Sequence, residues 1–379
     1  MKTPADVPGL VILGGGQLAR MMIAAAARLG LSPRVYQRED TGACDCAGEV
    51  RTSAWDDAEA LRTFLHPGDV LTLDHESIDL TTVRSVLPDG AVIRPGAQTM
   101  HWIADKIRQK KHAEEAGLPV GPYVAATTPE ELKAAAERFG YPVMLKRPHG
   151  SYDGFGNWTV KTPDDLAEGH AKLGGGTMLV EAWVPFKQEV AVIVARRPGG
   201  ASVVYPVAAT YQRNHQCEAV EVPAAIDPAI AAEAQRIAVA TADAFDCIGA
   251  VGVELFMLED GSLLLNELAP RPHNTGHYTI DACHTSQFEN HLRGVLDLPL
   301  GDPSLIGPAA AMVNVVGSRA GETSHHTLAA ALDVPGAAVH LYGKRTVRPG
   351  RKMGHVTALG KDVATARALA TDAAGKLEL

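Results

Sequence analysis

The sequence contains too few cysteines, in the wrong arrangement, for a disulfide-stabilised fold. Its 379 residues include five cysteines, an odd number, and only Cys44 and Cys46 lie close together. Disulfide scaffolds carry an even set of cysteines at regular spacing. A tetrahedral metal site needs more ligands than one isolated Cys-Asp-Cys pair supplies. We therefore expect neither a disulfide framework nor a metal site at these two residues.

Long apolar runs are also missing. No uninterrupted apolar stretch in the sequence approaches the roughly 18 residues that a membrane-spanning helix needs. The N-terminal residues MKTPADVPG contain no apolar core of a secretory signal. The sequence therefore predicts a cytoplasmic protein with no membrane partner.

Positive charge is in deficit as well. The chain has 35 Lys and Arg against 44 Asp and Glu, which gives a formal net charge of −9. This acidic balance argues against a nucleic-acid partner, so an anionic ligand must be held by a local basic cluster. A hydrophobic share of 46% and a charged share of 21% are ordinary for a soluble globular chain. At about 150 residues per domain, the length suggests two or three domains.

The stretch from Gly252 to His277 carries the most chemistry. Apolar residues alternate along its first part, at Val253, Leu255 and Met257. A turn at residues 259–261 ends in a glycine, and the apolar run Leu263 to Leu265 follows it. Alternation, a glycine turn and a second apolar run are typical of a β-hairpin.

This predicted hairpin brings two carboxylates together. Glu254 near the start of the first strand and Glu267 near the end of the second would lie side by side. Two like charges at close range repel each other unless a cation lies between them. Carboxylate oxygens beside the amide of Asn266 suit Mg²⁺, with Mn²⁺ as an alternative, and such an ion also binds phosphate oxygens.

A polar loop follows the hairpin. Its Pro and Gly residues argue against a helix, and its polar side chains are Arg271, His273, Asn274 and His277. A surface hairpin with incidental Glu is the plain alternative. The polar run NELAPRPHN is not explained by packing in a hydrophobic core, which favours a functional site.

The N-terminal segment predicts a strand, a glycine turn and a helix, over Leu10–Leu13, Gly14–Gly16 and Gln17–Leu29. Glycines there would let a phosphate approach the helix N-terminus. Gly14, Gly16 and Ala19 fit a dinucleotide fingerprint, but the second strand leads to Gln37 and Arg38 instead of an acidic residue. The glycine turn is therefore either scaffold or site.

A further strand, Val70–Leu73, ends in Asp74, His75 and Glu76. Polar groups at the carboxyl ends of strands lie where α/β sheets bind ligands. A solvated strand end is the alternative.

Residues 142–157 combine a buried-strand pattern ending in Lys146 with a glycine-rich loop. Such a lysine can meet nucleotide phosphates while backbone N–H groups of the loop close over them. The spacing is not that of a Walker A motif, which argues against a P-loop NTPase. A hairpin with glycines for geometry is the alternative.

Histidines and basic residues gather towards the C-terminus. The spacing of His273, His277, His284 and His291 fits no short zinc-ligand pair, so we do not expect a zinc site. We expect a helix after Ala282 that carries His284, Glu289, His291 and Arg293. The segments HLYGK, 340–344, and RPGRKMGH, 348–355, are either a solvated turn or part of an anion site.

The order of these motifs resembles the ATP-grasp ligases. The shared pattern is a strand with Glu, a turn, a strand ending in Asn-Glu, and then Pro-Arg-x-His-Asn-x-Gly-His. Residues 266–293 are closely similar to the ATP-grasp family that carboxylates aminoimidazole ribonucleotide with ATP and bicarbonate in the purine pathway. Matching motifs run from residue 11 to residue 357, which is nearly the whole chain.

The resemblance implies an α/β fold of the mixed ATP-grasp type in three parts. These are a Rossmann-like domain over residues 1–108, a two-lobed ATP-grasp domain over 109–302 and a small β-rich domain over 303–379. It also implies a homodimer whose partners are small molecules, namely ATP, bicarbonate and aminoimidazole ribonucleotide.

The resemblance also assigns roles to residues. The implied ATP-binding residues are Lys106, Lys146, Ser151, Tyr152, Asp153, Gly154, Phe155, Gly156, Asn157, Glu181, Ala182, Trp183, Val184, Glu189, Gln212, Asn266 and Glu267. The implied residues for the acceptor substrate are Gln17, Leu18, Glu76, Tyr152, Asp153, Arg271, Asn274, Lys344, Arg351 and Lys352. The implied catalytic residues are Asp153, Arg271, His273 and Lys344, and the implied metal ligands are Glu254 and Glu267.

The implied chemistry begins with transfer of a phosphoryl group from ATP to bicarbonate, which gives carboxyphosphate. The amine of the acceptor would attack carboxyphosphate, or the carbon dioxide released from it. The products would be 5-(carboxyamino)imidazole ribonucleotide, ADP and phosphate. Because water must be excluded, the loop 151–157 would act as a lid.

Some positions depart from the family pattern. Lys106 stands where the family usually has Arg, and it supplies charge without a two-pronged hydrogen bond. Ser151 and Asn157 replace the first Gly and the last Gln of the family loop, and Gln212 stands where His is common, which predicts a weaker phosphate contact. These departures leave a nucleotide-binding regulatory protein as an alternative. Another alternative is a formate-dependent glycinamide ribonucleotide transformylase, although segments 340–344 and 348–355 favour the carboxylating enzyme.

Overall fold

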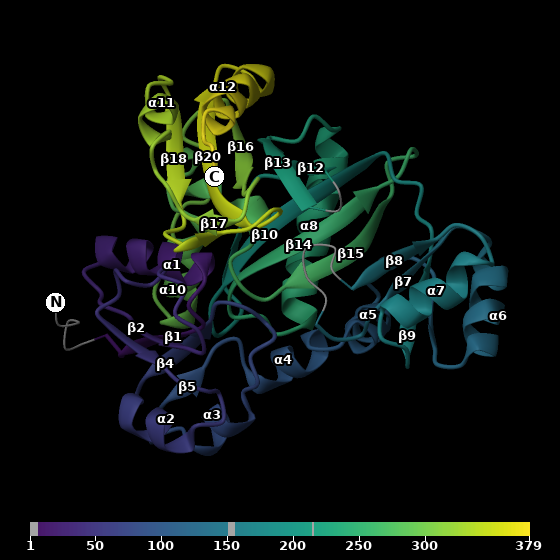
Figure 1. The fold of residues 1–379 in the computed structure, drawn as a ribbon, viewed down its shortest axis with the longest axis horizontal. Helices are drawn as coiled ribbons and strands as arrows, with labels where there is room; N and C mark the ends of the chain where they lie inside the picture. The colour runs from purple at the N-terminus through teal and green to yellow at the C-terminus, as the bar shows by residue number, and fades with distance from the viewer. Residues whose placement is uncertain (1–6, 151–155, 214–215) are drawn as a thin grey trace.

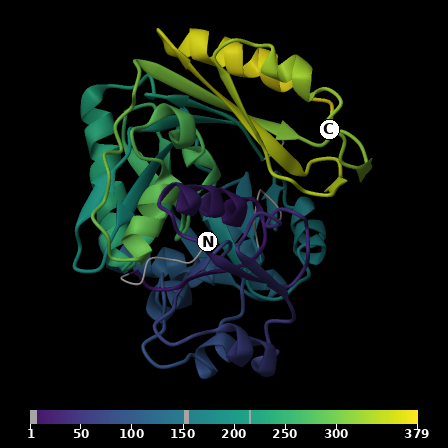
Figure 2. The ribbon, with the colours of Figure 1, turned by 90° about the vertical axis from the view of Figure 1, so that its left-hand side faces the viewer.

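The computed structural model describes residues 7–150, 156–213 and 216–379. Their strands form three main sheets, and Figures 1 and 2 show how these sheets and their helices are arranged. This mixed α/β architecture agrees with the predicted fold class. All five cysteines are free. Within the described ranges, no helix is long and apolar enough to cross a membrane.

The N-terminal sheet has five parallel strands in the order β3-β2-β1-β4-β5. Its strands are β1 (Leu10–Leu13), β2 (Arg34–Gln37), β3 (Glu49–Thr52), β4 (Val70–Leu73) and β5 (Val92–Ile93). Its helices are α1 (Gln17–Arg28), α2 (Ala58–Phe64), α3 (Thr81–Ser85) and α4 (Ala97–Ile103). The central strand β1 is entirely apolar and buried, as expected for a parallel strand covered on both faces.

The glycine turn after β1 is closed by a side chain of the protein itself. The carboxylate of Asp74, which follows β4, accepts hydrogen bonds from the backbone N–H groups of Gly16 at 2.7 Å and Ala19 at 2.8 Å. These amides at the start of α1 are the groups that would otherwise meet a phosphate. Asp74 is therefore a buried cap of α1 instead of a solvated strand end, while Gln17 and Leu18 of the same helix start lie in the wall of the cavity.

A small antiparallel sheet lies at the right of Figure 1, in the order β6-β9-β7-β8. Its strands are β6 (Tyr123–Ala126), β7 (Val143–Lys146), β8 (Asn157–Val160) and β9 (Met178–Ala182). Helices α6 (Pro129–Phe139) and α7 (Asp165–Lys172) pack against it. Helix α6 begins at a capping box, in which Thr128 and Glu131 satisfy each other's backbone N–H groups.

The largest sheet has nine strands, eight of them in the order β15-β14-β10-β12-β13-β16-β20-β18. Its strands are β10 (Gln188–Arg196), β11 (Ser202–Val204), β12 (Ala208–Arg213), β13 (Gln216–Val222), β14 (Gly249–Met257), β15 (Leu263–Ala269), β16 (Ala309–Val316), β18 (Ala337–Leu341) and β20 (Lys352–Gly360). Helix α8 (Pro228–Ala244) packs on β10 and β14.

The C-terminal strands continue this sheet, because β16 pairs with β13 from Ala219↔Val313 to Val222↔Ala310. Figure 2 shows α12 (Val363–Gly375) lying along the outer face of these strands. The same segment contains α11 (Leu328–Leu332) and the short pair β17 (Gly321–Glu322) and β19 (Thr346–Val347). The predicted small β-rich part therefore has no separate main sheet, and the domain boundaries at 108/109 and 302/303 stay a prediction.

Two predictions about helical segments were wrong. The loop predicted to be non-helical contains a 3₁₀ turn, η1 (Asn274–Gly276). His284 lies before the expected helix, since Ser286 caps the start of α10 (Gln287–Val295). The single-turn helix α9 (Thr279–Ala282) lies between η1 and α10. Helix α5 (Lys106–Glu115) begins at residue 106, because the Asp105 side chain caps the N–H groups of residues 107 and 108.

The predicted hairpin is formed by β14 and β15. Its register pairs Glu254 directly with Glu267. Gly252 on β14 leaves room for the His273 side chain, because a Cβ atom at residue 252 would lie 2.4 Å from the Cβ of His273. The register thus sets two carboxylates and an imidazole on one patch of the sheet.

His291 joins the N-terminal sheet to the large sheet. Its Nδ1 accepts the backbone N–H of Ala250 at 3.0 Å, so Nε2 carries the proton and donates it to Thr72 Oγ1 at 2.8 Å. The ring is fully buried, and burial lowers the pKa of His291 to about 3. Gly249 has φ +90°, and a Cβ there would lie 2.6 Å from Nδ1 of this ring. A neutral imidazole therefore fixes two sheets relative to each other.

We predict that His291→Ala lowers the free energy of unfolding by about 2–4 kcal/mol, because two buried hydrogen bonds and a packed ring are lost. His284→Ala is the matched control, because His284 is exposed, and it should change stability by less than about 0.5 kcal/mol. Urea unfolding of both variants measures the difference. Equal stability of the two variants would contradict the role of His291.

The pH dependence has a definite sign. The folded pKa of His291 is about 3 and the ordinary value is 6.5, so the unfolded state binds more protons between these values. The contribution of His291 to stability is therefore complete above pH 6.5 and is lost as the pH falls towards 3. His291→Ala should lose this part of the acid sensitivity.

Candidate active site

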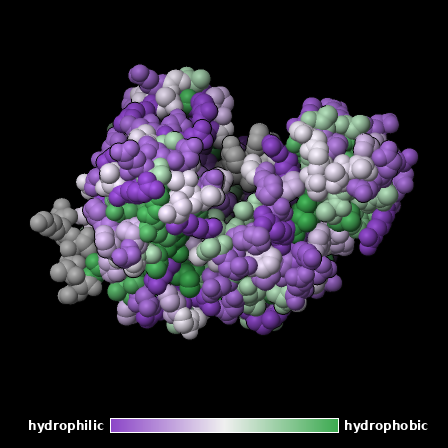
Figure 3. Space-filling model, turned by 90° about the horizontal axis from the view of Figure 1, so that it is seen from below, coloured by the Kyte–Doolittle hydropathy of each residue, from purple (hydrophilic) through white to green (hydrophobic). Residues whose placement is uncertain are grey.

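A cavity of about 1560 Å³ opens between the N-terminal sheet, the small sheet and the large sheet. Figure 3 shows the small sheet's lobe standing across a hollow from the rest of the molecule. Pockets for one drug-sized ligand are typically about 300–1,000 Å³, so this cavity has room for more than one substrate. The described candidate residues from the sequence line it, with the exception of Gly156. Ser151, Tyr152, Asp153, Gly154 and Phe155 lie outside the described residues.

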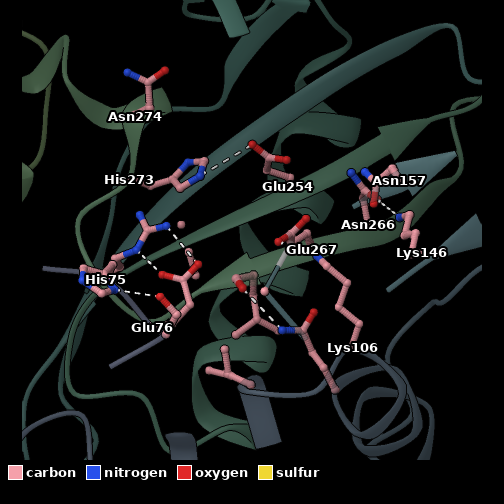
Figure 4. Close-up of a pocket in the computed structure, with 18 of the residues that line it drawn as sticks. His75, Glu76, Lys106, Lys146, Asn157, Glu254, Asn266, Glu267, His273 and Asn274 are labelled. Atoms are coloured by element: carbon pink, nitrogen blue, oxygen red, sulfur yellow. Dashed lines mark hydrogen bonds and ion pairs between the residues drawn. The ribbon is translucent and has the colours of Figure 1, made fainter. Parts of the chain in front are cut away.

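Glu254 and Glu267 face the cavity as a pair. Burial raises the pKa of Glu254 to about 8, and the nearby charges of Glu267 and Glu189 add to this effect. Burial also opposes ionisation of Glu267, but Lys106, with Nζ 2.8 Å from Glu267 Oε1, lowers its pKa below the ordinary value. Figure 4 shows Lys106 reaching towards Glu267 and His273 lying beside Glu254.

This pair fits a divalent cation. Burial is the main cause of the raised pKa of Glu254, and the charges of Glu267 and Glu189 add to it; a hard cation bound by carboxylate oxygens would offset both effects. Among the residues that the structure describes, no group of three or more His, Cys, Asp or Glu side chains could hold a metal by itself. An ion here would therefore need further oxygen atoms from a ligand or from water.

Lysines from two elements surround the carboxylate of Glu181 on β9. Lys146 Nζ lies 2.6 Å from its Oε2 atom, and Lys110 Nζ lies 2.6 Å from its Oε1 atom. Burial alone would raise the pKa of Glu181, yet the two ammonium groups lower it to about 2. Lys146 also lies 3.5 Å from Asn266 Oδ1. Sequence reasoning did not single out Lys110, and its spacing of four residues from Lys106 on α5 was the available signal.

Arg271 and Glu76 form an ion pair between the large sheet and the N-terminal sheet. The Arg271 Nε atom donates to Glu76 Oε2, and Nη2 donates to Oε1 at 3.1 Å. Burial would raise the pKa of Glu76, but the guanidinium lowers it to about 2. Glu76 thus balances the charge of Arg271 and fixes the direction of its guanidinium plane.

His273 is uncharged at neutral pH. Burial lowers its pKa to about 4, and the positive charge of Arg271 acts in the same direction. Its Nδ1 lies 2.9 Å from Thr275 Oγ1, and its Nε2 lies 3.8 Å from Glu254 Oε1. The ring can therefore serve as a neutral hydrogen-bonding group beside the carboxylate pair.

An apolar slot lies between the small sheet and the β14–β15 hairpin. Trp183 is 45% exposed and Phe186 41% exposed, which is unusual for such large rings. Phe186 stacks on Phe256 with ring centroids 4.6 Å apart. Met144 and Leu264 complete the slot beside Ala182 and Val184. A flat heteroaromatic base fits a slot of this kind.

Sequence reasoning missed four of these residues, namely Met144, Phe186, Phe256 and Leu264. The strand pattern carried a signal for some of them. Val143 and Leu145 are buried, while Met144 between them is only partly buried and points to the other face. An apolar residue on the cavity face of a strand was therefore predictable from alternation.

The end of the cavity that is formed by the C-terminal segment is basic. Lys344 Nζ donates to the carbonyl oxygen of Lys352 at 2.7 Å and lies 5.5 Å from the centre of the Tyr342 ring. Arg351 Nη1 donates to Thr346 at both its carbonyl and its hydroxyl oxygen. The remaining candidates in the cavity wall are Gln17, Leu18, Asn157, Glu189, Gln212 and Asn274.

Asn274 at this end is already partly engaged. Its side-chain amide exchanges hydrogen bonds with that of Asn314 at 3.0 Å and 2.7 Å. Asn314 Nδ2 also donates to the carbonyl oxygen of Cys217 at 2.9 Å. The structure therefore brings a carboxylate pair, a lysine cluster, an apolar slot and a basic end into one cavity.

Comparison with known protein families matches almost the whole chain. Residues 111–288 match the ATP-grasp domain, residues 9–104 the ribonucleotide synthetase preATP-grasp domain, and residues 310–369 the phosphoribosylaminoimidazole carboxylase C-terminal domain. The N5-carboxyaminoimidazole ribonucleotide synthase of Mycobacterium bovis is 40% identical over 380 residues, which cover 96% of this chain and 87% of that protein.

Solved structures are similar over the same extent. The carboxyaminoimidazole ribonucleotide synthase of Aspergillus clavatus complexed with ATP superposes with a TM-score of 0.89 and 34% identity, covering 98% of this chain and 99% of that one. The Aspergillus clavatus synthase in complex with ADP and 5-aminoimidazole ribonucleotide gives a TM-score of 0.88 and 34% identity, covering 97% and 98%.

We predict that Glu76→Gln lowers the free energy of unfolding at pH 7 by about 1–3 kcal/mol, because Arg271 loses its counter-charge in a largely buried position. The contribution of Glu76 is complete above its ordinary pKa of 4.5 and is lost as the pH falls towards its folded pKa of about 2. The stability difference between wild type and variant should therefore shrink from pH 5 to pH 3.

Urea unfolding at both pH values measures this difference. Glu49→Gln on the edge strand β3 is the control, since Glu49 is exposed and its replacement should have no measurable effect. A difference between wild type and Glu76→Gln that stays constant down to pH 3 would show that the ion pair does not set it.

Proposed function

The chain belongs to the N5-carboxyaminoimidazole ribonucleotide synthase family of ATP-grasp ligases, and from this membership we propose how its residues carry out the reaction. The reaction is the ATP-dependent carboxylation of 5-aminoimidazole ribonucleotide in purine biosynthesis. The observation that carries the proposal is the Glu254–Glu267 pair, which faces the lysine cluster and the Arg271–Glu76 pair in one cavity.

The nucleotide occupies the side of the cavity between the small sheet and the hairpin. Its base lies in the apolar slot, beside the backbone of Ala182, Trp183 and Val184. Its phosphates lie towards Lys106, which pairs with Glu267, and Lys146, which lies 3.5 Å from the side-chain oxygen of Asn266 beside Glu267. Glu189 on β10 and Gln212 on β12 contact the ribose and phosphates from the large sheet.

Glu254 and Glu267 would hold Mg²⁺, or Mn²⁺ in its place, together with oxygen atoms of the nucleotide. When bound, such an ion neutralises charge on the phosphoryl group that is transferred to bicarbonate. Glu254 is suited to this contact, because a bound cation would offset the burial and the like charges that raise its pKa. Lys106, which pairs with Glu267, would also be within reach of the nucleotide phosphates.

The acceptor occupies the basic end of the cavity. Arg351 and Lys352 face its phosphate, while Arg271, held in place by Glu76, binds the anionic carboxyphosphate. His273 is neutral and can form one hydrogen bond to an oxygen atom attached to the reacting carbon. Lys344 lies beside Lys352 on the acceptor side, and the role of Asp153 in orienting the attacking amine rests on the family resemblance.

The oligomeric state and location follow from the family in this proposal. A homodimer in the cytoplasm is consistent with an enzyme of purine biosynthesis whose partners are small molecules. The division into three domains at residues 108/109 and 302/303 belongs to the same proposal.

Phosphate release tests the function. Wild-type protein with ATP and Mg²⁺ should release phosphate only when both aminoimidazole ribonucleotide and bicarbonate are present, at about one phosphate per carboxylated product. Release that depends instead on glycinamide ribonucleotide and formate would identify a transformylase. Nucleotide binding with no release under any of these conditions would identify a regulatory protein.

We predict that Glu267→Gln lowers kcat by at least about 100-fold while the fold is kept, because a carboxamide cannot supply the charge of a metal ligand. Glu259→Gln is the control, because Glu259 lies in the turn of the same hairpin and its side chain is 80% exposed. Activity of Glu267→Gln within about tenfold of wild type at saturating Mg²⁺ would remove Glu267 from the metal site.

A further inference from the structure

Helix α5 presents two lysines to two different sheets. Lys106 and Lys110 lie four residues apart, on the same side of the helix. Lys106 pairs with Glu267 on β15 of the large sheet, whereas Lys110 pairs with Glu181 on β9 of the small sheet. The helix therefore lies between the two lobes that enclose the nucleotide, with one ammonium group directed to each.

Glu181 and Lys146 are neighbours on the cavity face of the small sheet. The register pairs Glu181 with Met144, and Lys146 lies two residues further along β7 on the same face. The two side chains are thus diagonal neighbours, and Lys146 Nζ reaches Glu181 Oε2 at 2.6 Å. The other oxygen of the same carboxylate is held by Lys110, also at 2.6 Å.

A charge at residue 110 is not explained by packing. The side chains of Lys110 and Lys146 are 9% and 11% exposed, and that of Glu181 is 12% exposed. Buried ion pairs contribute little net stability compared with apolar side chains of similar volume. Burial and the positive charges of Lys146 and Lys106 lower the pKa of Lys110, and the Glu181 carboxylate acts against this lowering. The triad therefore has an arrangement that stability alone does not require.

The contact of Lys110 with Glu181 limits how Lys146 can bind the same carboxylate. A carboxylate that faced Lys146 alone would attract its ammonium group with a full charge and could rotate to bind it with both oxygens. With Lys110 on Oε1, the carboxylate plane is fixed and only Oε2 remains for Lys146. Lys146 then keeps donor capacity for a second anion, since an ammonium group has three N–H donors.

We propose that Lys110 is a positioning residue for ATP, which holds Glu181 so that Lys146 is directed at the nucleotide phosphates. This inference rests on the proposed function for the identity of the nucleotide. It adds to that function a residue that acts through Glu181 and Lys146.

The test compares Lys110→Met, which keeps the length of the side chain and removes its charge, with Lys110→Arg, which keeps the charge. Lys111→Met is the matched control, because Lys111 is the next residue on α5, 69% exposed and paired only loosely with Glu115 at 3.7 Å. The measurements are the KM for ATP, the KM for aminoimidazole ribonucleotide, kcat, the affinity for Mg²⁺–ADP by calorimetry, and the melting temperature.

Lys110→Met should raise the KM for ATP and the Kd for Mg²⁺–ADP by about tenfold or more, with the KM for aminoimidazole ribonucleotide within about twofold of wild type. Lys110→Arg should recover most of the ADP affinity, and Lys111→Met should match wild type in every constant. A purely structural role would lower the melting temperature but leave the ADP affinity of the folded protein unchanged, which would overturn the proposal.

A double-mutant cycle tests the route through Glu181. Once Glu181→Gln has removed the carboxylate charge, Lys110→Met should change the ADP affinity by less than about twofold. Independent, additive effects would mean that Lys110 meets the nucleotide directly, which would also overturn the proposal. If Lys110→Met does not fold, Lys110→Gln takes its place, since its amide keeps a hydrogen bond without the charge.

The role of Lys110 and the proposed function of the protein can fail separately. If wild type does not release phosphate with aminoimidazole ribonucleotide and bicarbonate, the proposed function fails. Calorimetry with Mg²⁺–ADP needs no turnover, so it decides the role of Lys110 in either case.

Discussion

Carboxylates that line the cavity and each need a positive charge determine its layout. Glu76 forms an ion pair with Arg271, and Glu267 forms one with Lys106. Glu181 forms ion pairs with both Lys110 and Lys146. Glu254 differs, because its ion-pair contact is the neutral His273 at 3.8 Å, and burial together with the charges of Glu267 and Glu189 raises its pKa to about 8. The cavity therefore combines three carboxylates balanced by the protein with a fourth that a bound cation would balance. A nucleotide with its metal brings both the cation for Glu254 and the phosphates for the lysines.

The positions of these charges depend on contacts between the sheets. Arg271 follows the large sheet and Glu76 follows the N-terminal sheet, so their pairing requires both to be docked. His291 provides part of that docking through Thr72 and Ala250. Helix α5 connects the N-terminal and small sheets and reaches both lobes through Lys106 and Lys110. Changes at these contacts should therefore affect the site even where no substrate is touched.

Much of the site was predictable because it depends on local patterns. The register of one hairpin sets Glu254 opposite Glu267, and alternation with a glycine turn revealed that hairpin. The position of Lys146 at the end of β7 was predictable for the same reason. Asp74 was harder to interpret, since a carboxylate at a strand end can bind a ligand or cap a helix. Its hydrogen bonds to Gly16 and Ala19 depend on how β4 lies beside β1.

The sequence by itself determined the strands, the hairpin and the residue types of the chemistry, because hydrophobic periodicity and glycine turns act over a few residues. Only the tertiary structure decided which charges meet. In the sequence, Lys110 is one of several lysines on a polar helix, and only the contact of α5 with β9 shows that it pairs with Glu181. The strands after residue 303 were likewise predicted to be a separate domain, but β16 pairs with β13 of the large sheet. These pairings join residues far apart in the chain. An unpaired charge in a low-dielectric interior costs free energy, so the packing of the sheets decides which residue pairs with each buried charge. The sequence alone does not show these partners.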